Sequence, residues 1–227
     1  SNSNSINRNQ QQSFGSTIDH KVSETFSYKF TPNLSWQQTS SISEDSTLTR
    51  SGLDPNGNLI NSNTTASSSV SDAVNASSNL LLRKKFAKKG RTISSTITQS
   101  YNQSNSTGNQ YTSQYFYANG NLTSDSILDQ QNIRKGNTAS YSANLIYTEP
   151  ISKRSLLEFN SYLSKSIGSS SKKVYDQNDV TDSYDLLNKR LTNEFNSEYT
   201  YSGGGMSFRS NQKKFNFATG VSLQNAV

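Results

Sequence analysis

The chain has 227 residues, a formal net charge of +6 and only 30% hydrophobic residues, whereas roughly 45 to 50% is usual in a soluble domain. It has no cysteine and one histidine, which excludes a disulfide framework, a thiol nucleophile and a histidine-rich metal site. Disordered chains are poor in aromatic residues, but this chain has 12 Tyr and 10 Phe. We therefore expect an ordered structure with polar ends and loops.

Residues 1–16 are rich in Asn, Ser and Gln and predict a flexible polar lead-in. From Ile18 to Phe30 the even positions are mostly apolar, which predicts a strand. Proline fixes φ and lacks an N–H, so we expect the strand to end in a turn at Pro32. A second strand is expected from Leu34 to Ile42.

A polar loop follows, with a strong turn signal at 54–58. Asp54, Asn56 and Asn58 have the opening spacing of a calcium loop, but the glutamate expected at its twelfth position is missing. We therefore interpret this segment as a turn, and we expect no metal and no cofactor.

Six further strands are predicted at about 67–86, 91–117, 127–148, 155–175, 186–209 and 214–227. Turns or loops separate them at 87–90, 119–121, 149–154, 176–182 and 211–213. The glycines Gly203, Gly204 and Gly205 are expected to bend a curved strand.

Apolar and small polar residues alternate along several of these strands. Successive side chains of a strand point to opposite faces, so the sheet should have one apolar and one polar face. The many polar residues leave little for a globular core, so we expect lipid to cover the apolar face. This reasoning predicts an all-β, antiparallel up-and-down transmembrane β-barrel of about eight strands over 17–227, in the cell outer membrane. The positions expected to face lipid are Ile93, Ile97, Tyr141, Leu145, Tyr147, Leu157, Phe159, Leu163, Phe195, Tyr199, Tyr201, Phe215, Phe217 and Val221.

Short turns at Pro32, 88–89, 153–154 and 212–213 alternate with longer polar connections. In transmembrane barrels short turns face the periplasm and longer loops face outside. The predicted periplasmic turns carry cations that suit phospholipid head groups better than a nucleic-acid groove. These cations are Lys84, Lys85, Lys88, Lys89, Lys153, Arg154, Lys213 and Lys214. An aromatic passage in a predicted outer loop, Tyr111, Tyr115 and Tyr117, could contact a ligand, with packing at a strand end as the alternative.

Three segments carry a resemblance to a known family: KFTPNLSW at 29–36, LLLRKKFAKKGRT at 80–92 and LIYTEP at 145–150. They resemble the Bacteroidota-type outer-membrane β-barrel family, which is related to the TonB-dependent receptors, and the similarity extends from about Ile18 onward. The middle segment is the most specific of the three.

The resemblance implies a barrel of about 22 strands around a plug domain, with energy for ligand uptake delivered by an inner-membrane complex. This sequence contains no plug and no energy-coupling box, and it ends Asn225-Ala226-Val227 without a terminal aromatic residue. We therefore expect a section of about eight strands of a larger barrel, with a complete small barrel as a variant. The partners implied are outer-membrane lipid, the rest of the barrel and plug, and the energy-coupling complex, without nucleic acid.

The predicted function is to form the wall and outer loops of a ligand-uptake pore. The alternative is a soluble secreted β-rich surface protein, such as an adhesin or fibre, whose apolar faces bury one another. Enzymatic activity is not expected, because the sequence offers no base for a serine nucleophile beyond His20.

Overall fold

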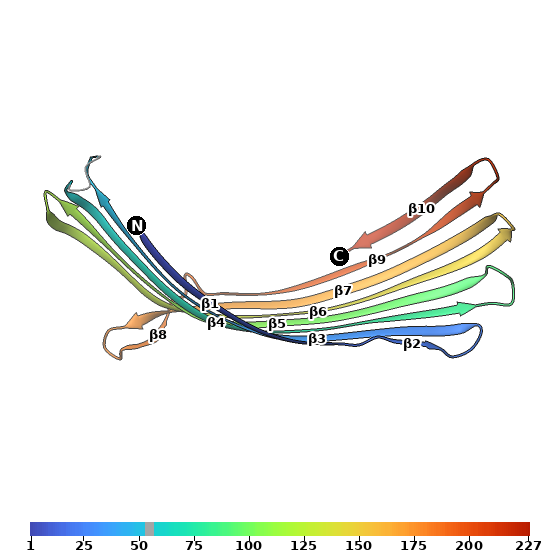
Figure 1. Ribbon diagram of the computed structural model, residues 1–227, viewed down its shortest axis with the longest axis horizontal. Helices are drawn as coiled ribbons and strands as arrows, with labels where there is room; N and C mark the ends of the chain where they lie inside the picture. Colours follow the sequence, from blue (N-terminus) through green and yellow to red (C-terminus); the bar gives the residue numbers. More distant parts are fainter. Residues whose placement is uncertain (53–56) are drawn as a thin grey trace.

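The computed structural model describes residues 1–52 and 57–227, and the regular elements in these ranges are all β-strands (Figure 1). Asp54 and Asn56, which belong to the predicted turn, lie outside the described residues. The strands are β1 (Asn2–Gly15), β2 (Ile18–Lys21), β3 (Phe26–Arg50), β4 (Leu59–Lys85), β5 (Thr92–Ala118), β6 (Asn121–Ser152), β7 (Ser155–Asn178), β8 (Ser183–Leu187), β9 (Asn193–Asn211) and β10 (Asn216–Ala226).

All ten strands form one antiparallel sheet. Its main path is β1-β3-β4-β5-β6-β7-β9-β10, so each long strand pairs with the next one along the chain. β2 pairs with β3 next to β1, and β8 pairs with the end of β7. The predicted all-β, antiparallel up-and-down fold with about eight strands is confirmed, and the sheet remains open between the edge strands β1 and β10.

The long strands run side by side along the length of the molecule and bend near their middle (Figure 1). One end, here called the turn end, carries the connections 22–25, 86–91, 153–154 and 212–215. The opposite end, here called the far end, carries the connection from β3 to β4 and that from β5 to β6.

The sheet has almost no hydrophobic core of its own. Val174 is the only fully buried apolar side chain among the described residues. Its backbone is enclosed by the segment after β8, since Asn188 N donates to Val174 O at 2.8 Å and Val174 N donates to Thr192 Oγ1 at 3.1 Å. The sheet's other apolar side chains therefore need a covering that the sheet itself does not supply.

The turn expected at Pro32 is not formed, because Pro32 lies inside the continuous strand β3, opposite Ser78 of β4. Ser16 N donates to Pro32 O at 3.1 Å, so the backbone of Pro32 faces the β1–β2 edge. Ser16 and its neighbour form the break between β1 and β2. Proline has no N–H to donate, and at Pro32 this missing donor would face the break between β1 and β2 in the edge strand. The hydrogen bonds between β3 and β4 therefore lose no donor. The chain reverses instead at 22–25.

The segment expected to be a flexible lead-in differs from that expectation. Asn2–Gly15 forms β1 and pairs with β3 from Asn2 opposite Ser46 to Gly15 opposite Asn33. Its side chains are nearly all exposed on both faces. Such a strand shows no period-two pattern, so the backbone pairing could not be recognised from the side chains.

The connection between β5 and β6 is also shorter than expected. Asn119 and Gly120 alone separate the two strands, with φ values of 51° and 81°. Both angles lie in the left-handed region, which is the pattern of an Asn-Gly hairpin turn. The β5–β6 hairpin therefore extends far because its strands are long, and its connecting loop is short.

Candidate functional site

The strand register combines the alternating patterns of single strands into two faces. Tyr147 of β6 lies opposite Ile93 of β5 and Phe159 of β7, and Phe159 lies opposite Met206 of β9. Opposed residues of an antiparallel pair project from the same face. We call this surface the apolar face, and its large members include Tyr28, Phe30, Leu80, Leu82, Ile93, Ile97, Tyr141, Leu145, Tyr147, Leu157, Phe159, Leu163, Met206, Phe208, Phe217 and Val221.

The apolar face is open in the described chain. Leu163 is 54% exposed and Val221 is 64% exposed. A contiguous apolar surface of this kind marks contact with a membrane or with another apolar partner.

The opposite surface, here called the polar face, is built from hydroxyl and amide side chains. Ser140 Oγ lies 2.9 Å from Ser166 Oγ on the neighbouring strand. Asn79 Nδ2 donates to Thr98 Oγ1 at 3.1 Å. These hydrogen bonds between neighbouring strands satisfy polar side chains, and the polar face can be hydrated.

Three of the residues expected to face lipid lie on the polar face. Phe195, Tyr199 and Tyr201 of β9 lie opposite Ser170, Ser166 and Ser164 of β7, all on the polar face. The expectation was wrong in grouping them with Phe159, because alternation within one strand does not fix which parity shares a face with the next strand. On β9 the even residues Met206 and Phe208 occupy the apolar face instead.

Phe215 lies in the turn before β10, where its backbone O accepts from Gln212 N at 2.9 Å. It is therefore not a residue of a spanning strand. The other ten residues expected to face lipid all lie on the apolar face.

The apolar face is apolar only along its turn-end half. On β6 the apolar positions run from Tyr147 to Ala139, and Asn137 and Lys135 follow them. On β7 the same change comes after Leu163, because the next residue on this face is Lys165, which pairs with Glu198 of β9 at 2.6 Å. We call the apolar half the belt; on β6 its length, from Ala139 to Tyr147, matches the roughly 9–11 residues with which a tilted strand crosses a bilayer. The strands are much longer than the belt and continue beyond it at the far end.

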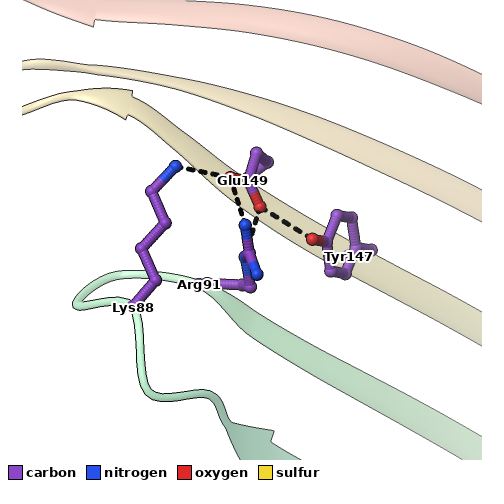
Figure 2. A network of polar contacts seen from close by, with 4 residues as sticks. All are labelled: Lys88, Arg91, Tyr147 and Glu149. Carbon is purple, nitrogen blue, oxygen red and sulfur yellow. Dashed lines mark hydrogen bonds and ion pairs between the residues drawn. The ribbon is translucent and has the colours of Figure 1, made fainter.

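A polar cluster lies where the belt ends, at the turn end (Figure 2). The carboxylate of Glu149 accepts from Arg91 Nε at 2.6 Å, from Arg91 Nη2 at 2.9 Å, from Lys88 Nζ at 2.6 Å and from Tyr147 OH at 2.7 Å. The hydrogen bonds from Arg91, then those from Lys88 and Tyr147, hold the pKa of Glu149 well below its usual range.

The Glu149 cluster has aromatic neighbours on its belt side. The ring of Tyr147 lies 6.4 Å from that of Phe86 and 6.3 Å from that of Phe159. Aromatic rings with polar ends are typical of the interface between hydrocarbon and water. The side chains therefore change from apolar to aromatic to charged along the end of β6.

No helix in the described residues is long and apolar enough to cross a membrane. The sequence model described as "Outer membrane protein beta-barrel family" matches residues 84–225, which is more than half of the chain. The chain belongs to the outer membrane protein beta-barrel family. A search of curated proteins gives no match.

Members of the family lie in the cell outer membrane, which places this barrel chain there. The matched residues begin at the end of β4 and include all of β5 to β9 and most of β10. In a membrane barrel one face of the sheet meets lipid and the other lines the lumen. The family therefore favours the barrel interpretation over a soluble fibre.

The cations that were expected in the periplasmic turns all lie at the turn end of the chain. Lys88, Lys89, Lys153 and Arg154 lie in or beside two neighbouring turns and line one cavity. Lys213 and Lys214 lie in the turn before β10, and Lys84 and Lys85 close β4 on the apolar and polar faces. Lys84 Nζ lies 5.9 Å above the ring of Phe86, within cation–π range.

A tyrosine stack on the polar face was not expected from the sequence. The rings of Tyr162 and Tyr201 lie 5.0 Å apart, and Tyr162 OH donates to Tyr201 OH at 3.2 Å. Tyr201 OH in turn donates to Gln224 Oε1 at 2.6 Å. Gly203 lies opposite Tyr162, and a Cβ there would collide with the tyrosine hydroxyl. The glycine run thus provides the floor on which the ring lies.

A hollow of about 410 Å³ lies on the polar face at the middle of β4 to β7. No charged residue lines it; its lining includes Ala73, Asn102, Gly136, Gly168 and Phe195. Small side chains in the lining leave room for the hollow, and the exposed ring of Phe195 lies at the border of the hollow. The hollow forms because small residues on neighbouring strands lie opposite one another, and this is visible only once the strand register is known.

The aromatic passage expected in an outer loop belongs to a strand. Tyr111 and Tyr115 lie opposite Asp129 and Asp125 within the β5–β6 ladder, and Tyr117 follows a register shift. These residues extend the far-end hairpin beyond the belt.

Proposed function

We propose that this chain forms the wall and outer loops of a TonB-dependent-receptor-like ligand-uptake pore, as the resemblance of residues 80–92 and 145–150 implies. The observation that carries the proposal is the opposition of the two faces. The belt lies on one side of the sheet, and an uncharged hollow lies on the other.

The apolar face meets lipid in this proposal. Each large side chain of the belt gains about 25 cal/mol per Å² when its apolar surface leaves water. The polar face lines the lumen, where its hydroxyl and amide groups remain hydrated.

The turn end lies in the periplasm, and the far end projects from the cell. Support comes from the long connection between β7 and β9, residues 179–192 with β8, which lies at the far end, since longer loops face outside. The cluster around Glu149, which lies at the turn-end border of the belt, adds to it. The far-end strands carry Tyr111, Tyr115 and Tyr117 beyond the membrane, where a ligand would first meet the protein.

The ligand path runs over the polar face. The hollow at mid-strand is bordered by Phe195, and Tyr199 follows on the same strand with 52% of its surface exposed. Exposed aromatic rings on an otherwise polar surface suit contact with a passing ligand. The remaining barrel, a plug domain and an inner-membrane energy-coupling complex are the partners in this proposal, and the chain carries out no catalysis.

Single cysteines provide the test, because the chain has none of its own. A membrane-impermeant maleimide added to intact cells should label Ser104→Cys, which lines the hollow, and leave Leu145→Cys in the belt unlabelled. Collapse of the inner-membrane proton gradient should change the labelling rate at Ser104→Cys, since energy-coupled uptake opens the lumen. A rate that is independent of the gradient would contradict uptake and leave the barrel intact.

A further inference from the structure

A half-open cavity lies at the turn end, between the β4–β5 turn and the β6–β7 turn. It measures about 730 Å³, which is in the range of ligand sites. Gly90 in the first turn has a φ of 86°, and a Cβ there would lie 3.5 Å from Pro150 Cβ. The first turn therefore lies against β6 and forms a wall of the cavity.

The cavity is lined by cations and by no carboxylate. Lys88 is paired with Glu149. Lys89, Lys153 and Arg154 form no ion pair within the part of the chain that the structure describes. Three positive charges thus converge on one space without an internal partner.

The floor of the same cavity is apolar. Pro150, Ile151 and Leu156 line it, and Ile151 is 59% exposed. A bare inorganic anion would leave this surface in water, so the better occupant combines acidic groups with apolar side chains.

The positive surface continues from the cavity onto the polar face. Leu156 lies opposite Arg209, and Arg83 and Lys85 project from the same face at the end of β4. One acidic residue, Glu158 of β7, projects from the same face near these cations. Such a row of charges matches an extended partner better than a single phosphate. The row also lies on the face opposite the belt, away from the bilayer.

We propose that this turn-end cavity binds an acidic, extended polypeptide segment that carries an apolar side chain. Its carboxylates pair with Lys89, Lys153 and Arg154, and its apolar side chain covers Pro150 and Leu156. The proposal rests on the family and on the geometry of the turns, and it does not depend on ligand uptake.

The test uses the chain in phosphatidylcholine nanodiscs and a fluorescein-labelled peptide, Glu-Glu-Leu-Glu-Glu, followed by fluorescence anisotropy. The triple variant Lys89→Gln, Lys153→Gln, Arg154→Gln should bind about tenfold more weakly, because three exposed ion pairs are lost. The matched control Lys84→Gln, Lys213→Gln, Lys214→Gln removes the same charge from the same end outside the cavity, and its affinity should change less than about twofold. The peptide Gln-Gln-Leu-Gln-Gln should not bind.

Equal weakening in the two triple variants would overturn the proposal, because binding would then depend on net charge alone. Displacement of the peptide by phosphatidylglycerol in the nanodisc would assign the cavity to a lipid head group and also overturn it. Should the cavity triple variant fail to fold, Arg154→Gln alone gives the same comparison against Lys213→Gln.

Discussion

Arg91 and Glu149 form an ion pair with two hydrogen bonds, Nε to Oε2 at 2.6 Å and Nη2 to Oε1 at 2.9 Å. The pair joins the turn after β4 to the end of β6, whose direct neighbour is β5. A bidentate pair of this kind fixes geometry as well as adding energy. The Glu149 side chain is only 23% exposed, so water competes weakly for the carboxylate.

Glu149→Gln should therefore lower the urea midpoint of unfolding, because Arg91 and Lys88 lose their anionic acceptor. The pKa of Glu149 is lowered in the folded state. The pair thus stabilises the fold above the unfolded-state pKa, and this contribution is lost as the pH falls through the folded-state pKa. The difference between wild type and variant should be constant from pH 7 to about pH 5 and shrink at more acidic pH. Glu158→Gln, which removes a carboxylate without an observed partner, is the control; an equal effect there would contradict the role of the pair.

Leu145→Arg should destabilise the membrane-inserted protein by about 2–4 kcal/mol, the cost of a cation near the middle of a bilayer. Asn144→Arg places the same charge one residue away on the polar face and should cost much less. Unfolding of both variants from lipid vesicles gives the comparison. Similar losses for the two would mean that the apolar face does not meet hydrocarbon.

The register of β9 predicts that Met206 faces lipid and that Tyr201 faces water, whereas the alternation of residues within β9 alone predicts the reverse. Spin labels at Met206→Cys and Phe159→Cys should be reached by a lipid-soluble quencher, since these residues lie opposite each other on the apolar face. A label at Tyr201→Cys should be reached by a water-soluble quencher instead. If the label at Tyr201→Cys proves the more lipid-accessible, the β7–β9 register is wrong.

Gly203→Ala should destabilise the fold by about 1–3 kcal/mol through overpacking. The added Cβ would meet the hydroxyl of Tyr162 and lie 2.5 Å from Leu223 O, a backbone atom that cannot move freely. Gly136→Ala is the control, because its nearest neighbour would be Ser169 O at 3.8 Å, an ordinary contact. Equal stability of the two variants would show that the Tyr162 ring does not rest on Gly203.

The β8 hairpin is tied to β6 by Tyr184, whose hydroxyl donates to Asp129 Oδ1 at 2.7 Å. The hydrogen bond to Asp129 raises the pKa of Tyr184 to about 12. Because the folded-state pKa lies above the unfolded value, the bond contributes fully below the unfolded pKa and is lost as the pH rises through the folded one. Tyr184→Phe should speed amide exchange in β8 about tenfold at neutral pH. The wild type should approach the variant only in strongly alkaline solution; a constant ratio across that range would contradict the tie.

Most of the sheet follows from the sequence because alternation and turn chemistry act locally. The turn at 87–90 and the strand pattern around Leu145 both depend on residues close in the chain, and both are found as expected. Pro32 misled the prediction because its effect depends on which neighbour its backbone faces. That is a property of the β1–β2 edge and not of residues next to Pro32.

The site was less predictable for the same reason. The hollow near Phe195 and the stack of Tyr162 on Gly203 arise from residues on different strands that the register brings together. Phe195 itself was noticed as an aromatic residue at an alternating position, but its face depends on how β9 pairs with β7. Pairing between strands carries the information that one strand alone lacks.

The two edges of the sheet determine how the protein can enter a bilayer. In the part of the chain that the structure describes, β10 pairs with β9 at one edge, and β1 and β2 pair with β3 at the other, so each edge presents one row of backbone N–H and C=O groups without a neighbour. Hydrocarbon cannot hydrogen-bond those groups, and each one left bare costs several kcal/mol. Insertion and lateral joining of the edge strands must therefore occur together, which makes the final strand-to-strand seam the event that commits this sheet to the membrane.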